Sequence, residues 1–191
     1  MMWDAVQWSL AGQVADFVKL SERGAAALIE DEPPEIYFAR LRAEGALDDA
    51  LAFLAAALPR RVAVAWGRDC LGRTARAVRL RPADTAASSA VAAWLDDPVD
   101  ERRRVAFEAA GAAEYASPQA PLALAVFLSG GSLAAPGCPQ QVPPAPELCG
   151  RMVAAAVALA AVRVQPALIA DTKSAFLERG NQLACSGLPS A

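Results

Sequence analysis

The side chains in this 191-residue sequence best suited to covalent or metal chemistry are its four cysteines, Cys70, Cys138, Cys149 and Cys185. They form no CxxC pair, and the chain contains no histidine. Without histidine, neither a mixed zinc site nor a Ser-His-Asp or Cys-His nucleophile can form. A four-thiolate zinc site and a Cys138–Cys149 disulfide both stay open, but free thiols are the expectation in a reducing compartment.

Three further patterns could carry chemistry, and each has a simpler structural explanation. The Gly-Gly-Ser turn at 127–132 lacks the GxSxG and GK[ST] patterns, so it indicates a helix end with a glycine cap. The acidic pairs Asp48-Asp49 and Asp96-Asp97 are adjacent on helices and do not converge on one point. Arg60-Arg61 and Arg102–Arg104 are typical of solvated faces with nearby acids. We therefore expect no catalytic residue, no metal and no cofactor.

Composition limits the class of protein. Hydrophobic residues make up 55% of the chain, and 47 residues are alanine, so extensive disorder is excluded. The net charge of −3 argues against a general nucleic-acid binder. The longest uncharged apolar run, Met152–Val162, is too short for a membrane span, and residues 1–20 lack the basic start of a signal peptide. The expectation is a cytoplasmic protein without membrane insertion.

Helix-forming residues dominate, and alternating strand patterns are scarce. Capping and breaking signals divide the chain at regular intervals. Asp84 or Thr85 is expected to cap one helix, and Asp97-Pro98 to start the next. The predicted helices are 34–43, 47–58, 60–76, 85–97, 99–113, 118–128, 147–164 and a last one from about 167 to 182. The sequence thus predicts an all-α, compact bundle of stacked helical hairpins, with about seven or eight helices and a long Pro-rich loop.

The expected organisation is one helical domain over residues 33–183. Residues 1–32 are expected to form an N-terminal arm or helix that packs only loosely, and residues 184–191 a flexible tail. The predicted core consists of the large apolar residues on the inward stripes of the helices, which are Leu51, Leu54, Leu58, Trp66, Trp94, Phe107, Phe127, Met152 and Val157.

Residues 130–146 form a loop with five prolines, three glycines and one serine. Its length and proline content favour extended polyproline conformation, and loops this long are usually functional or disordered. It is therefore either a contact surface or a long crossover lying on the bundle. The candidate partner-binding residues are Ser132, Leu133, Pro136, Gln140, Gln141, Val142, Pro143 and Pro144, together with Trp3 and Trp8 if these are exposed.

Three stretches carry a resemblance to a known family. They are the Ala-rich and Leu-Pro segment ending in Trp at 50–66, the Trp-Leu-Asp-Asp-Pro segment at 93–98 with Arg103 beyond it, and the segment 125–134 that leads into the Pro-rich loop. Together they cover roughly residues 33–165. In these stretches the chain resembles a bacterial family of small, Ala-rich proteins encoded in type VI secretion gene clusters.

The resemblance implies a role in effector delivery. The expected function is a non-enzymatic adaptor or co-chaperone that helps to load an effector or a PAAR-repeat spike-tip protein through protein–protein contact. The partner would be a secretion effector, its chaperone or a PAAR-repeat protein, and a homodimer is also open. The alternatives are an immunity-type protein that neutralises a toxin, and an enzyme that uses thiols or carboxylates.

Overall fold

The structure, a computed structural model, describes residues 2–75, 79–114 and 116–188. Within these residues the fold is helical, with ten α-helices and no strand, which confirms the predicted all-α class. Eight of the ten helices have at least nine residues, in agreement with the expected number. The helices are α1 (Ala11–Ala15), α2 (Glu22–Ala26), α3 (Pro34–Ala43), α4 (Leu47–Ala57), α5 (Arg60–Ala75), α6 (Pro82–Asp96), α7 (Asp100–Ala112), α8 (Gln119–Phe127), α9 (Leu148–Ala161) and α10 (Ile169–Ser186), the last preceded by a 3₁₀ turn, Pro166–Leu168.

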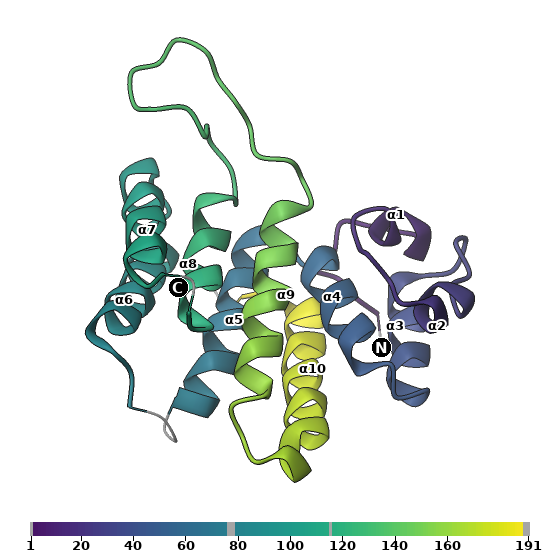
Figure 1. Ribbon diagram of the computed structural model, residues 1–191. Coiled ribbons are helices and arrows are strands. Elements are labelled where there is room, and N and C mark those ends of the chain that lie inside the picture. The colour runs from purple at the N-terminus through teal and green to yellow at the C-terminus, as the bar shows by residue number, and fades with distance from the viewer. Residues whose placement is uncertain (1, 76–78, 115, 189–191) are drawn as a thin grey trace.

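Helices α5 and α9 form the centre of the bundle (Figure 1). Helix α9 packs against α4, α5, α8 and α10, which agrees with its apolar sequence. The α6–α7–α8 group covers one side of this pair, and α3, α4 and α10 cover the other. One end of α9 is less enclosed, because Leu159 is 43% and Val162 53% exposed. No helix in the described ranges is both long and apolar enough to cross a membrane.

Trp66 on α5 is the largest fully buried side chain. Its indole nitrogen donates a 2.9 Å hydrogen bond to the backbone carbonyl of Phe176 on α10, which satisfies the only polar atom of the ring. Gly180 lies one turn further along α10, and a Cβ at this position would stand 2.8 Å from the indole nitrogen. The missing side chain therefore lets α10 lie directly on the Trp66 ring.

The predicted core residues occupy three kinds of position. Leu51, Leu54, Leu58, Trp66, Trp94, Phe127 and Val157 are buried. Met152 is half-buried against the core. Phe107 is 44% exposed, so its placement in the core was wrong. The buried stripe of α7 consists of Arg103, Ala106 and Ala110 instead. The two alanines let α7 approach α8 closely, and the larger Phe107 is left at the edge of the contact.

Two predicted helix starts were also wrong. Helix α6 begins at Pro82, earlier than Asp84, because Asp84 serves as the third residue of the first turn. Its carboxylate accepts hydrogen bonds from the Arg81 backbone N–H at 3.3 Å and from the Arg81 guanidinium at 2.9 and 3.0 Å. Asp97 terminates α6, and α7 starts at Asp100.

The N-terminal segment packs on the C-terminal helix, α10. The Trp3 indole is 5% exposed, lies 5.0 Å from the Phe38 ring and donates a 2.8 Å hydrogen bond to Asn181 on α10. The Ala5 N–H bonds to the carbonyl of Ala184 at 2.9 Å. Helix α10 continues to Ser186, so residues 184–186 are helical, where a flexible tail was expected. Residue 76, the end of the predicted helix 60–76, and residues 189–191 of the expected tail lie outside the described residues.

Gly180→Ala tests the close contact between α10 and Trp66. The added Cβ would meet the rigid indole, so the free energy of unfolding should fall by about 2 kcal/mol, in the usual range for overpacking. Urea unfolding monitored by circular dichroism measures the change. Gly111→Ala is the matched control, because no atom of the described residues lies within 4 Å of its added Cβ on α7 and alanine is the better helix former. Equal effects of both substitutions would contradict the close contact.

Acid should weaken the fold through Asp84. The Arg81 guanidinium holds the pKa of this carboxyl well below its usual range against the opposing effect of burial. A depressed pKa in the folded state means that the stabilisation is complete above about pH 4, the unfolded value, and is lost as the pH falls further. Asp84→Asn should cost about 2 kcal/mol at pH 7 and flatten the decline below pH 4.

The measurement is the urea midpoint as a function of pH, with Asp96→Asn as the control. Asp96 is exposed and has no hydrogen-bond or ion-pair partner among the described residues. If the urea midpoint of Asp84→Asn falls below pH 4 as steeply as that of the parent, Asp84 is not the group that makes the fold sensitive to acid.

Candidate interaction site

The Pro-rich loop leaves the bundle between α8 and α9 and rises away from the helices (Figure 1). Every residue from 135 to 143 is exposed. The loop therefore projects into solvent, and the alternative of a crossover lying on the bundle is not what the structure contains. A projection of this kind presents side chains on several sides to a partner.

The two arms of the loop are tied together at its base. The Leu133 N–H donates a 2.8 Å hydrogen bond to the Val142 carbonyl. The hydroxyl oxygen of Ser132, which is 8% exposed, accepts from the N–H groups of Ala134 at 3.1 Å and Val142 at 3.0 Å. The Leu133–Val142 and Val142–Ser132 hydrogen bonds thus join the two arms, the Ala134–Ser132 bond shapes the first arm, and residues 134–141 form the open tip.

A buried guanidinium fastens this base to the bundle. Arg103 on α7 is 4% exposed and donates to the carbonyls of Phe127 at 2.6 Å and Ser132 at 2.8 Å. Its Nε donates to Asp100 at 2.7 Å, and its guanidinium carbon lies 4.6 Å from the centre of the Phe127 ring. The sequence-based assignment of Arg102–Arg104 to a solvated face was therefore wrong for Arg103.

Gly131 is needed for this contact. Its φ of +65° lies in the left-handed region, and a Cβ would stand 3.0 Å from the Arg103 guanidinium. The Gly-Gly turn after α8 thus does more than end a helix. This turn lets the backbone pass so close to Arg103 that the guanidinium can donate its hydrogen bond to the Ser132 carbonyl.

The predicted partner-binding residues divide by exposure. Leu133, Pro136, Gln140, Gln141, Val142 and Pro143 are exposed. Ser132 and Pro144 are buried and belong to the base of the loop. Trp3 is buried in the fold and is not available to a partner. Trp8 is half-buried, with its ring 5.3 Å from that of Phe17.

Apolar side chains are exposed beside the base of the loop. Leu133 is 36% and Val142 42% exposed. Phe107, which stacks on Phe127 with ring centres 4.4 Å apart, is 44% exposed. Sequence reasoning missed Phe107 as a surface residue. The signal was its position one helical turn after Arg103 at the edge of an alanine stripe.

The cysteine side chains do not form a reactive group. All four are free thiols. Burial raises the pKa of Cys149 to about 12, and it also raises the pKa of Cys70 and that of Cys185. A nucleophilic cysteine needs a lowered pKa, so these three thiols stay protonated at neutral pH. Cys138 is exposed in the loop. Among the described residues, no three Cys, Asp or Glu side chains gather as a metal site would require.

The comparisons with known proteins identify a family without a known role. A family model described as "Family of unknown function (DUF6931)" matches residues 37–184, from α3 to the last turns of α10. No curated protein and no solved structure matches the chain. The matched segment contains the loop and Arg103, and it begins after α1 and α2.

Arg103→Met should loosen the base of the loop. The Phe127 carbonyl loses its charged donor and the Ser132 carbonyl keeps only a 3.4 Å hydrogen bond from Arg104, so we expect a loss of about 2–3 kcal/mol in the free energy of unfolding. Cleavage of the loop by proteinase K should also become faster. Arg104→Met is the control and should cost below about 1 kcal/mol, since Arg104 bonds to the half-exposed Asp100 at 2.7 Å and reaches the Ser132 carbonyl only at 3.4 Å. An unchanged rate of loop cleavage in Arg103→Met would show that the guanidinium does not anchor the loop.

Proposed function

Because the chain belongs to a protein family of unknown function, DUF6931, we propose its role from its own residues: it is a non-enzymatic adaptor or co-chaperone that binds a partner through the Pro-rich loop. One observation carries the proposal. The loop is exposed from 135 to 143, yet its base is fastened to the bundle by the buried Arg103. A purely connecting segment does not need a buried guanidinium at its base.

The anchored base favours binding by lowering its entropic cost. A free segment of this length loses much conformational freedom when it binds, and a segment that is partly ordered loses less. Prolines restrict the backbone of the open tip further and favour the extended polyproline form. Such segments dock in aromatic-lined grooves of other proteins. Leu133, Val142 and the neighbouring Phe107 add apolar area at the base.

We propose that the partner belongs to a type VI secretion system. The support is the resemblance of residues 50–66, 93–98 and 125–134 to proteins encoded in such clusters. The partner would be a secretion effector, its chaperone or a PAAR-repeat spike-tip protein, and the complex would form in the cytoplasm. The net charge of −3 fits a protein partner better than nucleic acid.

Co-purification tests this proposal. A tagged copy of the chain, expressed in its native host, should recover a secretion component in the wild-type form. Leu133→Ser/Val142→Ser should reduce the recovered amount at least tenfold, because it removes both exposed apolar side chains at the base of the loop. The helical circular dichroism spectrum should not change.

Val162→Ser is the matched control, because Val162 is 53% exposed on the opposite terminus of α9 from the loop. It should recover the parent amount. Recovery of no secretion component by the parent would refute the secretion role, and undiminished recovery by the loop variant would refute the loop as the contact. If the recovered protein is a toxin that co-expression neutralises, the immunity function replaces the adaptor function.

A further inference from the structure

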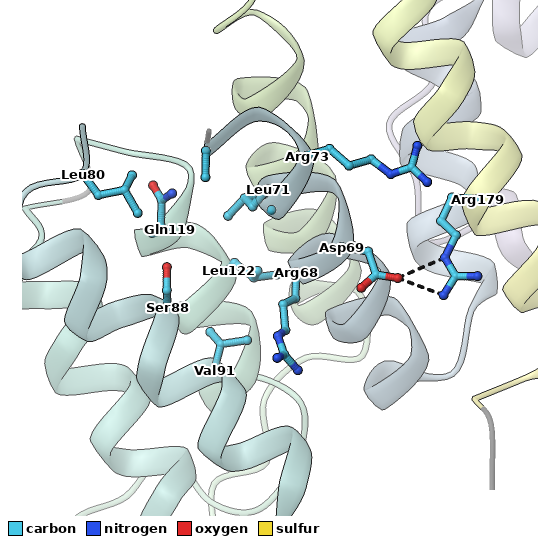
Figure 2. A pocket seen from close by; sticks show the side chains of 12 residues that line it. Arg68, Asp69, Leu71, Arg73, Leu80, Ser88, Val91, Gln119, Leu122 and Arg179 are labelled. Carbon is cyan, nitrogen blue, oxygen red and sulfur yellow. Dashed lines mark hydrogen bonds and ion pairs between the residues drawn. The ribbon is translucent and has the colours of Figure 1, made fainter. Parts of the chain in front are cut away.

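A second surface lies at the other end of α8 from the loop. It is a groove of about 1010 Å³ between α5, α6 and α8. The floor consists of Leu71, Val91 and Leu122, which are all less than 8% exposed. Figure 2 shows Ser88 and Val91 of α6 opposite Leu71 and Arg68 of α5, with Gln119 and Leu122 of α8 between them. We call this surface the Gln119 groove.

Gln119 has an unused hydrogen-bond acceptor in this groove. The residue is 3% exposed, and its side-chain oxygen has no hydrogen-bond partner in the described part of the chain. Buried polar atoms in folded proteins are nearly always paired, so an orphaned amide needs an explanation. The side chain lines the groove but its oxygen has almost no accessible surface, so the amide must turn about its terminal torsion before a ligand in the groove can supply the missing N–H donor.

The rim of the groove is positively charged. Arg68 and Arg73 are exposed, and neither has an ion-pair partner among the described residues. Arg179 is paired with Asp69, with 2.9 Å between the guanidinium and the carboxylate. Figure 2 shows Arg68 on the side of α5 that faces Val91, whereas Arg73 and Arg179 lie beyond Asp69 on the other side. Arg68 is therefore the cation that lies beside the apolar floor, on a chain with a net charge of −3.

From these observations we infer that the Gln119 groove binds an extended, acidic segment of a partner polypeptide. A main-chain N–H of the segment donates to the Gln119 oxygen, and the Gln119 amide group donates back to a main-chain carbonyl. An aliphatic side chain covers the floor of Leu71, Val91 and Leu122. A carboxylate of the segment pairs with Arg68.

The aliphatic floor distinguishes this occupant from a nucleic acid. A phosphate backbone is bound by rows of cations, whereas here one arginine lies beside a largely apolar floor. The inference goes beyond the proposed function, because no residue of the groove belongs to the loop. The two ends of α8 are about 12 Å apart along the helix axis.

The test uses nuclear magnetic resonance of the full chain labelled with nitrogen-15. The first probe is a pool of capped octapeptides that combine glutamate or aspartate with leucine or valine in all orders. The second is the same pool with lysine in place of the acids, and the third is inorganic phosphate. The acidic pool should shift the Gln119 side-chain amide signals in a saturable way at roughly millimolar concentration. The lysine pool and phosphate should not.

Two variants separate binding from folding. Gln119→Met should weaken binding of the acidic pool at least tenfold and raise the melting temperature by roughly 2–4 °C, because it removes an unpaired buried polar atom. Arg68→Gln should also weaken binding at least tenfold, whereas Arg151→Gln on the distant α9 should leave it unchanged. Leu133→Ser/Val142→Ser should bind the pool normally, so that a failure of the loop as a contact does not affect this result.

Three outcomes would overturn the inference. The first is the absence of a saturable shift with the acidic pool. The second is binding of phosphate that competes with the pool at equal strength, which would mark a small-anion site. The third is a lower melting temperature of Gln119→Met, which would mean that the amide is paired within the fold and has no need of a ligand.

Discussion

The contact between Trp66 and α10 is the constraint on which the rest of the bundle depends. Trp66 lies on α5, which packs against α6, α8, α9 and α10. A fully buried indole must satisfy its N–H, and the Phe176 carbonyl does so only if α10 lies directly on the ring. Gly180 permits this approach. The position of α10 in turn provides the carbonyl of Ala184 and the side chain of Asn181 that hold the N-terminal arm.

Pairs of helices approach each other closely at several glycines and alanines in this fold. Gly150 brings α9 against α4, where a Cβ would stand 3.1 Å from the Ala55 carbonyl oxygen. Gly67 on α5 lies directly against the Leu122 side chain of α8, so a Cβ at this position would also be too close to its neighbour. Alanine stripes on α7 and α9 continue this pattern. The high alanine content therefore has a structural consequence, since small residues allow helices to pack at short distance. Where the alanines occupy the contact, a larger residue such as Phe107 lies at the surface.

Much of the fold could be predicted, and the errors have common physical causes. The helices 34–43 and 47–58 were placed nearly to the residue, because proline, glycine and leucine spacing mark their ends locally. The start of α6 was missed because Arg81, a residue with low capping preference, pairs with Asp84 there. Of the candidate site, the loop and its exposed residues were predicted. Arg103 and the Gln119 groove were not, because both are formed by residues from helices far apart in the sequence.

The sequence by itself determined the all-α class, most of the helix ranges and the position of the Pro-rich loop. These features depend on local propensities, breakers and periodicity, which act over a few residues. Only the tertiary structure decided that Arg103 is buried under the loop, that Trp3 lies inside the fold and Phe107 outside, and that the Gln119 amide oxygen has no partner among the residues that the structure describes. Burial is a property of neighbours, and here those neighbours come from other helices whose approach is set by glycine and alanine.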